Sequence, residues 1–346
     1  MPGRIPCDGE LPDAFREGAI MKSRPVLSCV IMGFILAALV SVAHADVLLV
    51  FSDVGGNTSV AEDLQAKLAA LGSISGHIDL FDATVDTPSL ATLQAYDAVM
   101  HWTNGDAADH VTLGDNLADY VDAGGGVVLA VFATGSSPGE CLAGRWSTGG
   151  YDPITPLGQA NGAMSLGTIH DAGHLVMHGV SALSGSNIYY GTGSVAGGAT
   201  RIADWANGAP LAVELGGKAT PILSLNLFPI STDVDASGWS TSTDGAVLMA
   251  NALNYVMGVL IDVSPASKFA PTGKYQGTFS PTTRDYTLTN FSGGAIDWSV
   301  SGPAWLNLAP SSGTALISGG AATITASLNG AMAQGMAPGV YPGDIT

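Results

Sequence analysis

The stretch Asp46-Val-Leu-Leu-Val-Phe51, followed by Ser52-Asp53-Val54-Gly55-Gly56, decides the fold of this chain. A short, continuously apolar run that stops at a loop-forming cluster is typical of a strand buried on both faces of a sheet. Apolar residues then recur at helical spacing before Gly72 ends the helix: Val60, Leu64, Leu68 and Leu71. The stretch therefore predicts a strand, a loop and a helix in that order, which is the repeating unit of an α/β sheet.

The same alternation continues along the chain. Further apolar runs predict strands at residues 77–81, 97–101 and 127–132. A second helix, between the last two runs, is indicated by apolar residues at helical spacing: Leu113, Leu117, Tyr120 and Val121. Strands that alternate with helices at this pitch predict a doubly wound α/β sheet over residues 46–262, with ligands bound at the carboxyl ends of the strands.

Several segments of residues 46–258 occur in the order found in a known family. They are Tyr96-Asp-Ala-Val99, Gly124-Gly-Gly-Val-Val-Leu-Ala-Val131, Cys141-Leu-Ala-Gly-Arg-Trp146, His174-Leu-Val-Met-His-Gly-Val180 and Asp244-Gly-Ala-Val-Leu-Met-Ala-Asn251. Together they resemble class I glutamine amidotransferase-like domains, particularly the trehalose-utilisation (ThuA-like) branch. The resemblance implies a flavodoxin-like or amidotransferase-like sheet.

The turn after residues 127–132 departs from that family. The resemblance implies a nucleophilic Cys there, placed so that backbone N–H groups stabilise an oxyanion. This chain has Ala133, then Thr134 and Ser136, and no His-x-Glu sequence follows. Ala133 cannot attack a substrate, Thr134 or Ser136 would need a base that the sequence does not reveal, and Cys141 lies beyond the turn. We therefore predict no amidotransferase chemistry, no catalytic residue and no cofactor.

Three histidines, His170, His174 and His178, are spaced by four residues. On one helix they would share a face and could bind Zn²⁺ through their imidazole nitrogens. Glycines interrupt the stretch, however, and favour a loop with short strands in which the histidines border a pocket.

A second candidate for metal binding is the acidic segment that starts at Asp233. Asp233 and Asp235 precede Gly238, and Asp244 stands at the twelfth position, which is the ligand spacing of a Ca²⁺ loop. An Asp replaces the usual bidentate Glu at that position. The same residues resemble the family's connection into its last helix, where Thr243 or Asp244 would act as the N-cap. Both interpretations stay open.

The pattern changes after residue 262, where residues 263–274 form a linker. The remainder shows alternating strands without helical periodicity. It contains, in order, Leu288-Thr-Asn290, Trp298, Trp305-Leu306, Pro310-Ser-Ser-Gly313 and Gly339-Val-Tyr-Pro-Gly-Asp-Ile345. Residues 275–346 thereby resemble the BACON-type domain of carbohydrate-active and surface proteins. The resemblance implies an all-β immunoglobulin-like sandwich, truncated at its C-terminal end. Its two tryptophans are expected in the core, with stacking on a sugar as the alternative.

The N-terminal part of the chain has the features of an export signal. Lys22 and Arg24 precede an uncharged apolar run, and Ala43-His44-Ala45 supplies small residues at the positions that a signal peptidase recognises. Residues 21–45 are therefore predicted to be a signal peptide, preceded by an upstream extension at 1–20. The apolar run is too short to span a bilayer comfortably. We expect an exported protein (periplasmic, cell-surface or extracellular) with no membrane span in its mature chain.

The charge of the chain limits its partners. It carries 11 Lys and Arg against 29 Asp and Glu, a formal net charge of −18. This charge repels nucleic acid and anionic lipid and suits Ca²⁺ or neutral ligands such as glycans.

These observations favour a non-catalytic binding or scaffolding protein with carbohydrate as its ligand and a glycan or a cell-surface molecule as its partner. The expected binding residues are Asp53, Thr103, Asn104, Thr134 and His174. The alternative is a secreted enzyme that acts on sugars or glycoconjugates through Asp and His groups or a metal. A glycosidase needs two carboxyl groups flanking the sugar, and Glu140 with Asp152 or Asp171 is the pair available. A third option is a structural spacer.

Cleavage of the signal peptide gives a direct test of export. We expect the exported protein to begin at Asp46, because Ala43 and Ala45 provide the small residues that the peptidase requires. N-terminal sequencing of the exported protein measures this. An Ala45→Arg variant should keep its leader, and an N-terminus elsewhere in the wild type would contradict the prediction.

Overall fold

A computed structural model describes residues 45–346, except residues 75, 136, 156, 259–260, 266, 275–276, 291–294 and 318. The predicted extension at 1–20 and the predicted signal peptide, apart from Ala45, lie outside the described residues. Within the described part of the chain, no helix is both long enough and apolar enough to cross a membrane.

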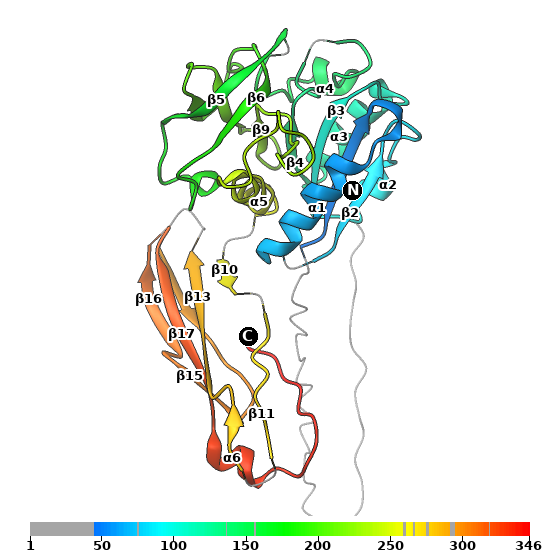
Figure 1. Cartoon of the computed structure of the whole chain (residues 1–346). Helices are drawn as coiled ribbons and strands as arrows, with labels where there is room; N and C mark the ends of the chain where they lie inside the picture. Colours follow the sequence, from blue (N-terminus) through cyan, green and yellow to red (C-terminus); the bar gives the residue numbers. More distant parts are fainter. Residues whose placement is uncertain are drawn as a thin grey trace, which may run out of the picture. The chain divides into compact units, whose positions relative to one another are not determined.

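The first part of the described chain forms a nine-stranded sheet of order β2-β1-β3-β4-β9-β8-β7-β5-β6 (Figure 1). Its parallel half consists of β1 (Val47–Asp53), β2 (Ile78–Asp82), β3 (Ala98–Asn104), β4 (Gly126–Ala130) and β9 (Ile222–Leu225). The strands predicted from apolar runs are all present. β1 and β4 are buried along their whole length, as uninterrupted apolar sequences require.

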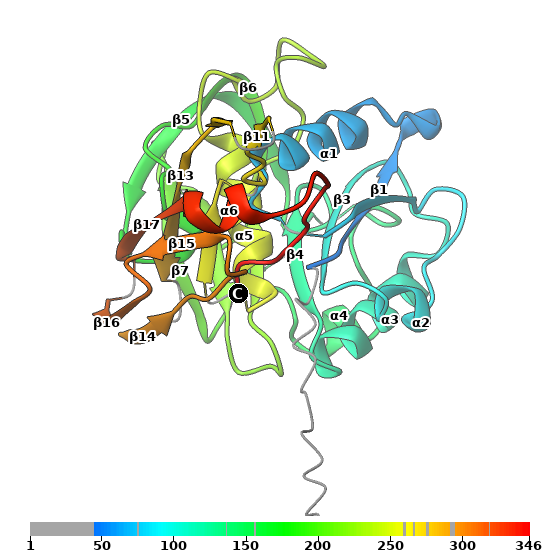
Figure 2. The same cartoon turned by 90° about the horizontal axis from the view of Figure 1, so that it is seen from below.

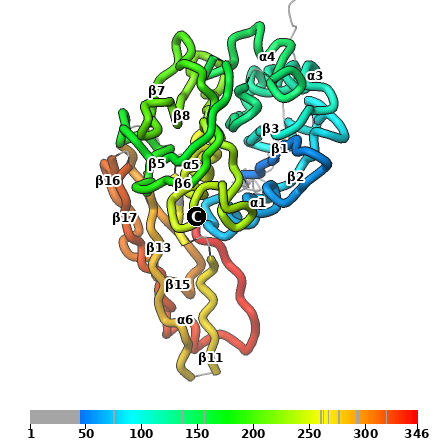
Figure 3. Tube along the Cα trace, turned by 45° about the horizontal axis from the view of Figure 1, so that its top comes forward, coloured from blue at the N-terminus to red at the C-terminus, as the bar shows by residue number. Residues whose placement is uncertain are grey.

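The other half of the sheet is antiparallel, which the sequence pattern did not predict. It consists of β5 (Gln159–Ile169), β6 (Ser184–Gly191), β7 (Ala199–Trp205) and β8 (Pro210–Leu215). β8 pairs with β9, and the order continues through β7 and β5 to β6, which is the last strand. In Figure 3 these four strands lie together, apart from β1 and β2.

Helices cover both faces of the parallel half (Figure 2). One face packs against α1 (Ser59–Leu71), α5 (Gly245–Val256) and the 3-10 turn η2 (Leu175–Met177). The other packs against α2 (Leu90–Leu93), α3 (His110–Asp122) and α4 (Arg145–Thr148). A further 3-10 turn, η1 (Val54–Gly56), follows β1. Helix α1 buries Leu64 and Leu68 and ends at Gly72, whose φ of 65° suits glycine. The predicted α/β domain is therefore confirmed.

Residues from 261 onward form smaller antiparallel sheets. One has four strands in the order β10 (Ile261–Ser264), β13 (Thr283–Asn290), β17 (Ala321–Leu328) and β15 (Leu306–Ala309). Two pairs accompany it: β11 (Thr272–Gly273) with β12 (Phe279–Ser280), and β14 (Ile296–Ser299) with β16 (Ser312–Leu316). These strands agree with an all-β part, and the immunoglobulin-like sandwich stays a prediction.

Two sequence-based expectations for this part are wrong. A short helix, α6 (Gly330–Gly335), lies where no helical periodicity was recognised, because its sequence is too short to show one. Asn329 provides its N-cap by accepting from the Met332 amide at 3.3 Å. Trp298 and Trp305 are only partly buried instead of lying in a core.

A histidine lies within the parallel sheet. His101 of β3 is fully buried, and its Nδ1 donates to the Val50 carbonyl oxygen at 3.0 Å, whereas Nε2 has no partner among the described residues. Burial lowers the pKa of His101 to about 4 because desolvation disfavours the imidazolium, and the hydrogen bond to Val50 opposes this shift. The side chain is therefore neutral in the folded protein at neutral pH.

Substitution of His101→Asn, whose amide NH₂ takes the place of the Nδ1 donor toward the Val50 carbonyl, tests the effect of this burial. Between pH 6.5 and about 4 the unfolded side chain binds a proton that the folded one does not, so the wild type loses stability as the pH falls. Relative to the variant, we expect its free energy of unfolding to drop by about 3 kcal/mol from pH 7 to pH 4. Urea unfolding at both pH values measures this. A pH-independent difference between the two proteins would contradict it.

Candidate functional site

Predicted binding residues meet at the carboxyl ends of neighbouring parallel strands. We call this group the strand-end site: Asp53, Thr103, Asn104 and Thr134. Asp53 and Asn104 end β1 and β3 and are direct partners in the register of these strands. Asn104 Nδ2 donates to Asp53 Oδ1 at 2.7 Å, and the Val54 amide donates to the same oxygen at 2.8 Å. Asp53 is 3% exposed, and its Oδ2 has no donor among the described residues.

The turn after β4 brings Thr134 to the same end of the sheet. The Phe132 amide donates to the Thr103 carbonyl at 2.9 Å, which ties the turn to β3. Ala133 is buried at the position where the amidotransferase resemblance implies a nucleophile. The hydroxyls of Thr103 and Thr134 are buried, and neither has a hydrogen-bond partner among the described residues. No described base therefore contacts Thr134, and Ser136 lies outside the described residues.

Asn226 is a site residue that the sequence analysis missed. It follows β9 directly, is fully buried, and its Oδ1 accepts from the Gly191 amide at 2.7 Å. Its Nδ2 donates to the Gly191 and Pro210 carbonyls at 3.0 and 2.8 Å. The sequence does contain a pattern that could have identified Asn226, because this polar residue directly follows the short strand sequence Ile222-Leu-Ser-Leu225. Asp53 and Asn104 were predicted from the same kind of pattern.

An aromatic group packs beside the turn after β4. Phe132 stacks on Phe228 with a centroid distance of 5.6 Å and meets Tyr189 edge-on, also at 5.6 Å. The Phe228 amide donates to the Tyr189 carbonyl at 3.1 Å, so the chain after β9 runs along the outer edge of β6. Aromatic rings thus adjoin the strand-end site on the side of β6.

His174 does not belong to the strand-end site, contrary to expectation. Its Nε2 lies 3.3 Å from Glu214 Oε2, and the Tyr255 hydroxyl donates to Glu214 Oε1 at 2.8 Å. The hydrogen bond from His174, aided by Tyr255, holds the pKa of Glu214 below its ordinary value against the effect of burial. Glu214 pairs with Leu223 near the start of β9, and Tyr255 lies at the end of α5. This group therefore lies toward the opposite end of the sheet from Asp53.

The three histidines of the candidate zinc pattern do not share a helix. His170 follows β5 and its Nε2 lies 2.8 Å from Asp204 Oδ2. His174 precedes η2 and His178 follows it, with the His178 carbonyl accepting from Asn251 Nδ2 at 2.7 Å. The helical alternative is therefore wrong. Among the residues that the structure describes, no three His, Cys, Asp or Glu side chains are grouped to hold a metal ion.

The acidic residues of the candidate Ca²⁺ loop serve separate contacts. Asp233 Oδ2 accepts from Lys67 Nζ at 2.7 Å, and Asp235 accepts from the hydroxyl and the amide two residues further on. Asp244 is at the N-cap position of α5, but its side chain accepts from the amides of residues 181–182, both at 2.8 Å. The carboxylates do not form one cation site, so the Ca²⁺ alternative is wrong in this structure.

Cys141 and Asp152 lie beyond the turn after β4. Burial raises the pKa of the Cys141 thiol, and the carboxylates of Asp152 and Glu140 add to this, which opposes the thiolate that a nucleophilic Cys needs. Burial also raises the pKa of Asp152 to about 6, although the hydrogen bond from Trp146 Nε1 to its Oδ1, at 2.8 Å, opposes the shift.

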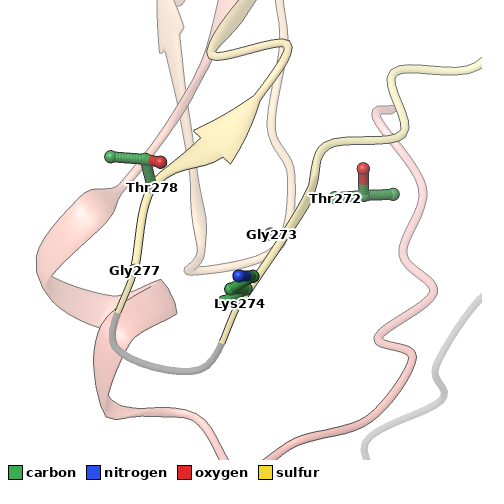
Figure 4. A pocket seen from close by; sticks show the side chains of 5 residues that line it. All are labelled: Thr272, Gly273, Lys274, Gly277 and Thr278. Carbon is green, nitrogen blue, oxygen red and sulfur yellow. The ribbon is translucent and has the colours of Figure 1, made fainter.

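Two hollows in the described surface lie away from the strand-end site. One, of about 590 Å³, adjoins the hairpin of β11 and β12 and is lined by Thr272, Gly273, Lys274, Gly277 and Thr278 (Figure 4). We assign it no site, because residues 275–276 within this hairpin are not described. The other, of about 200 Å³, lies beside Tyr96, Tyr120 and Met257. Neither lining includes a histidine or a pair of carboxylates.

A scan against protein-family models and a search of curated proteins found no match for this chain. Among solved structures, it is similar to the cytoplasmic protein STM1381 of Salmonella typhimurium LT2 (TM-score 0.45, 13% identity, 61% of this chain and 99% of that chain). It is also similar to a ThuA-like protein of Bacteroides uniformis (TM-score 0.45, 12% identity, 62% and 92%). A third is the cold-adapted β-galactosidase of Rahnella sp. R3 (TM-score 0.42, 14% identity, 82% and 41%). All three TM-scores lie below 0.5, so these similarities by themselves assign neither a family nor an activity.

The buried carboxyl of Asp152 predicts a measurable gain of stability on neutralisation. The folded side chain keeps its proton up to about pH 6, whereas the unfolded one releases it near pH 3.8, so the wild type loses stability as the pH rises between these values. Asp152→Asn mimics the protonated form and keeps an oxygen for Trp146. We expect it to raise the free energy of unfolding by up to about 3 kcal/mol at pH 8, with little effect at pH 3.5. Urea unfolding at both pH values measures this, and equal stabilities at pH 8 would contradict it.

Proposed function

We propose that this chain is an exported, non-catalytic binding protein whose strand-end site binds a neutral carbohydrate. The observation that carries the proposal is the orientation of Asp53. Its Oδ1 is held by Asn104 and by the Val54 amide, while Oδ2 has no donor among the described residues and is free to accept from a ligand hydroxyl. Charge-assisted hydrogen bonds of this kind are stronger than neutral ones and orient a hydroxyl-rich ligand.

The family assignment is part of the proposal. We infer that residues 46–262 form a ThuA-like domain without its amidotransferase nucleophile, followed by a BACON-type immunoglobulin-like domain at residues 275–346. The order of the sequence motifs supports the first, together with a parallel half-sheet that carries Ala133 at the turn after β4. The antiparallel strands after residue 261 support the second. The signal-like residues 21–45 support export and a glycan or cell-surface partner.

The rival proposal is a secreted enzyme on sugars or glycoconjugates. It needs an acid or base that contacts the reacting groups. The histidines expected for that role, His170 and His174, contact Asp204 and Glu214 instead of the strand-end site. The position of these two histidines away from the strand-end site therefore supports the binding proposal over the enzyme proposal.

Substitution of Asp53→Asn tests the binding proposal. We expect the wild-type protein to bind at least one neutral sugar from a panel of glucose, galactose, mannose and their tetrasaccharides. The variant should bind it about tenfold more weakly, because a hydrogen bond to a charged group is worth roughly 1.5–3 kcal/mol. Isothermal titration calorimetry measures both affinities.

Asp86→Asn is the matched control, since Asp86 is exposed and accepts only from the adjacent Thr87 amide among the described residues. Equal weakening by both substitutions, or none by Asp53→Asn, would contradict the site. Release of reducing sugar from a tetrasaccharide during the titration would favour the enzyme.

A further inference from the structure

The end of β6 lies beside the strand-end site. Asn226 holds Gly191, the last residue of β6, through both of its backbone groups. A Cβ atom at Gly191 would lie 3.2 Å from Asn226 Oδ1 and 3.9 Å from Thr134 Oγ1. The buried hydroxyl of Thr134, which lacks a partner among the described residues, is therefore a neighbour of β6 as well as of β3.

Polar and aromatic side chains share one face of the β5–β6 hairpin. We call it the Tyr189 face: Gln159, Asn161, Asn187 and Tyr189. Asn161 and Tyr189 are direct cross-strand partners, and the other two lie two residues away along their own strands, hence on the same face. Ile188, which points to the opposite face, is 2% exposed and belongs to the core. The Tyr189 face is therefore the outer face of the hairpin.

The groups on this face are held in fixed positions. Phe132 supports the Tyr189 ring edge-on and is itself backed by Phe228, yet Tyr189 remains 36% exposed. Asn161 Nδ2 donates to Asn187 Oδ1 at 2.6 Å, which orients both amides. This bond leaves the oxygen of Asn161 and the NH₂ group of Asn187 without partners among the described residues. The Asn161 oxygen, an acceptor, and the Asn187 NH₂ group, a donor, thus lie on the same face as the exposed Tyr189 ring.

We propose that the Tyr189 face binds one sugar ring of a neutral oligosaccharide whose other units reach the strand-end site. This inference rests on the proposed function. The C–H face of a pyranose packs on an aromatic ring, and its hydroxyls take hydrogen bonds from and to amides. The four side chains of the face are uncharged, and the net charge of −18 disfavours anionic sugars.

The spacing of the two surfaces specifies a ligand of more than one unit. β1 and β4 are separated by two strand spacings, about 10 Å, and the Tyr189 ring lies beyond the turn after β4. A single pyranose is too small to touch both Asp53 and Tyr189. An isolated exposed tyrosine is ordinary on a protein surface. What distinguishes Tyr189 is the fixed amide pair and the contact of its ring with Phe132 at the turn after β4.

Chain-length dependence of binding tests this inference. The full chain is titrated calorimetrically with glucose, galactose and mannose and with their neutral tetrasaccharides. The wild type should bind a tetrasaccharide more tightly than the matching monosaccharide. Tyr189→Ala should weaken tetrasaccharide binding about tenfold and leave monosaccharide binding unchanged, whereas Tyr189→Phe, which keeps the ring, should retain most of the affinity. Tyr341→Ala, which removes a tyrosine that is 43% exposed elsewhere, is the matched control.

The outcomes separate this inference from the proposed function. If the wild type binds none of these sugars, both fail. If it binds a tetrasaccharide and Tyr189→Ala binds it equally well, the inference fails alone. Asn187→Ala is a second variant with a smaller structural change, and it should weaken tetrasaccharide binding about threefold. Thermal unfolding of each variant confirms that it is folded.

Discussion

The amide of Asn226 holds the two halves of the sheet together at their carboxyl end. The three hydrogen bonds of this amide reach Gly191 at the end of β6 and Pro210 at the start of β8. The Trp205 indole donates to the main-chain carbonyl of Asn226 at 2.9 Å. As the last strand, β6 would otherwise present unpaired backbone groups along its outer edge. The chain that follows Asn226 covers this edge instead, since the Phe228 amide donates to the Tyr189 carbonyl. Asn226 itself is fully buried, so water cannot easily replace its hydrogen bonds. Removal of the amide would leave several buried backbone groups unsatisfied, each at a cost of about 1–3 kcal/mol.

The hydrogen bonds of Asn226 also bring β6 close to the turn after β4. Asn226 follows β9 and is hydrogen-bonded to Gly191 at the end of β6. The end of β6, the last strand of the sheet, therefore lies next to Thr134 in the turn after β4. Thr134 consequently has β3 on one side and the end of β6 on the other. The aromatic contacts of Phe132 with Tyr189 and Phe228 are made at the same turn.

Four of the five parallel strands could be predicted from sequence. β1, β3 and β4 are buried almost throughout and are therefore apolar runs, as residues 47–51 show, whereas β2 is only partly buried. β9 was not predicted, because it has only four residues. The antiparallel half could not be predicted. β5 alternates exposed and mostly only partly buried residues and contains two glycines, and its partners β6 and β7 are fixed by pairing between distant segments. Asp53 and Asn104 were predictable as polar residues directly after apolar runs. The place of His174 was not, because it depends on how η2 packs against α5, which no local pattern records.

The distribution of charge limits the ligands that the carboxyl end of the sheet can accept. Arg145 is engaged by Asp119 and Asp122 on α3, and Lys67 by Asp63 and Asp233, so these cations are neutralised on the helices. His170 and His174 contact the carboxylates of Asp204 and Glu214, away from the strand-end site. The amides of Asn104 and Val54 lie beside Asp53, whereas the aromatic rings lie further along the sheet, at the turn after β4. Fold alone does not determine function. The proposal of a hydroxyl-rich neutral ligand therefore rests on the carboxylate of Asp53, which Asn104 and the Val54 amide orient, and on the neutral side chains of the Tyr189 face.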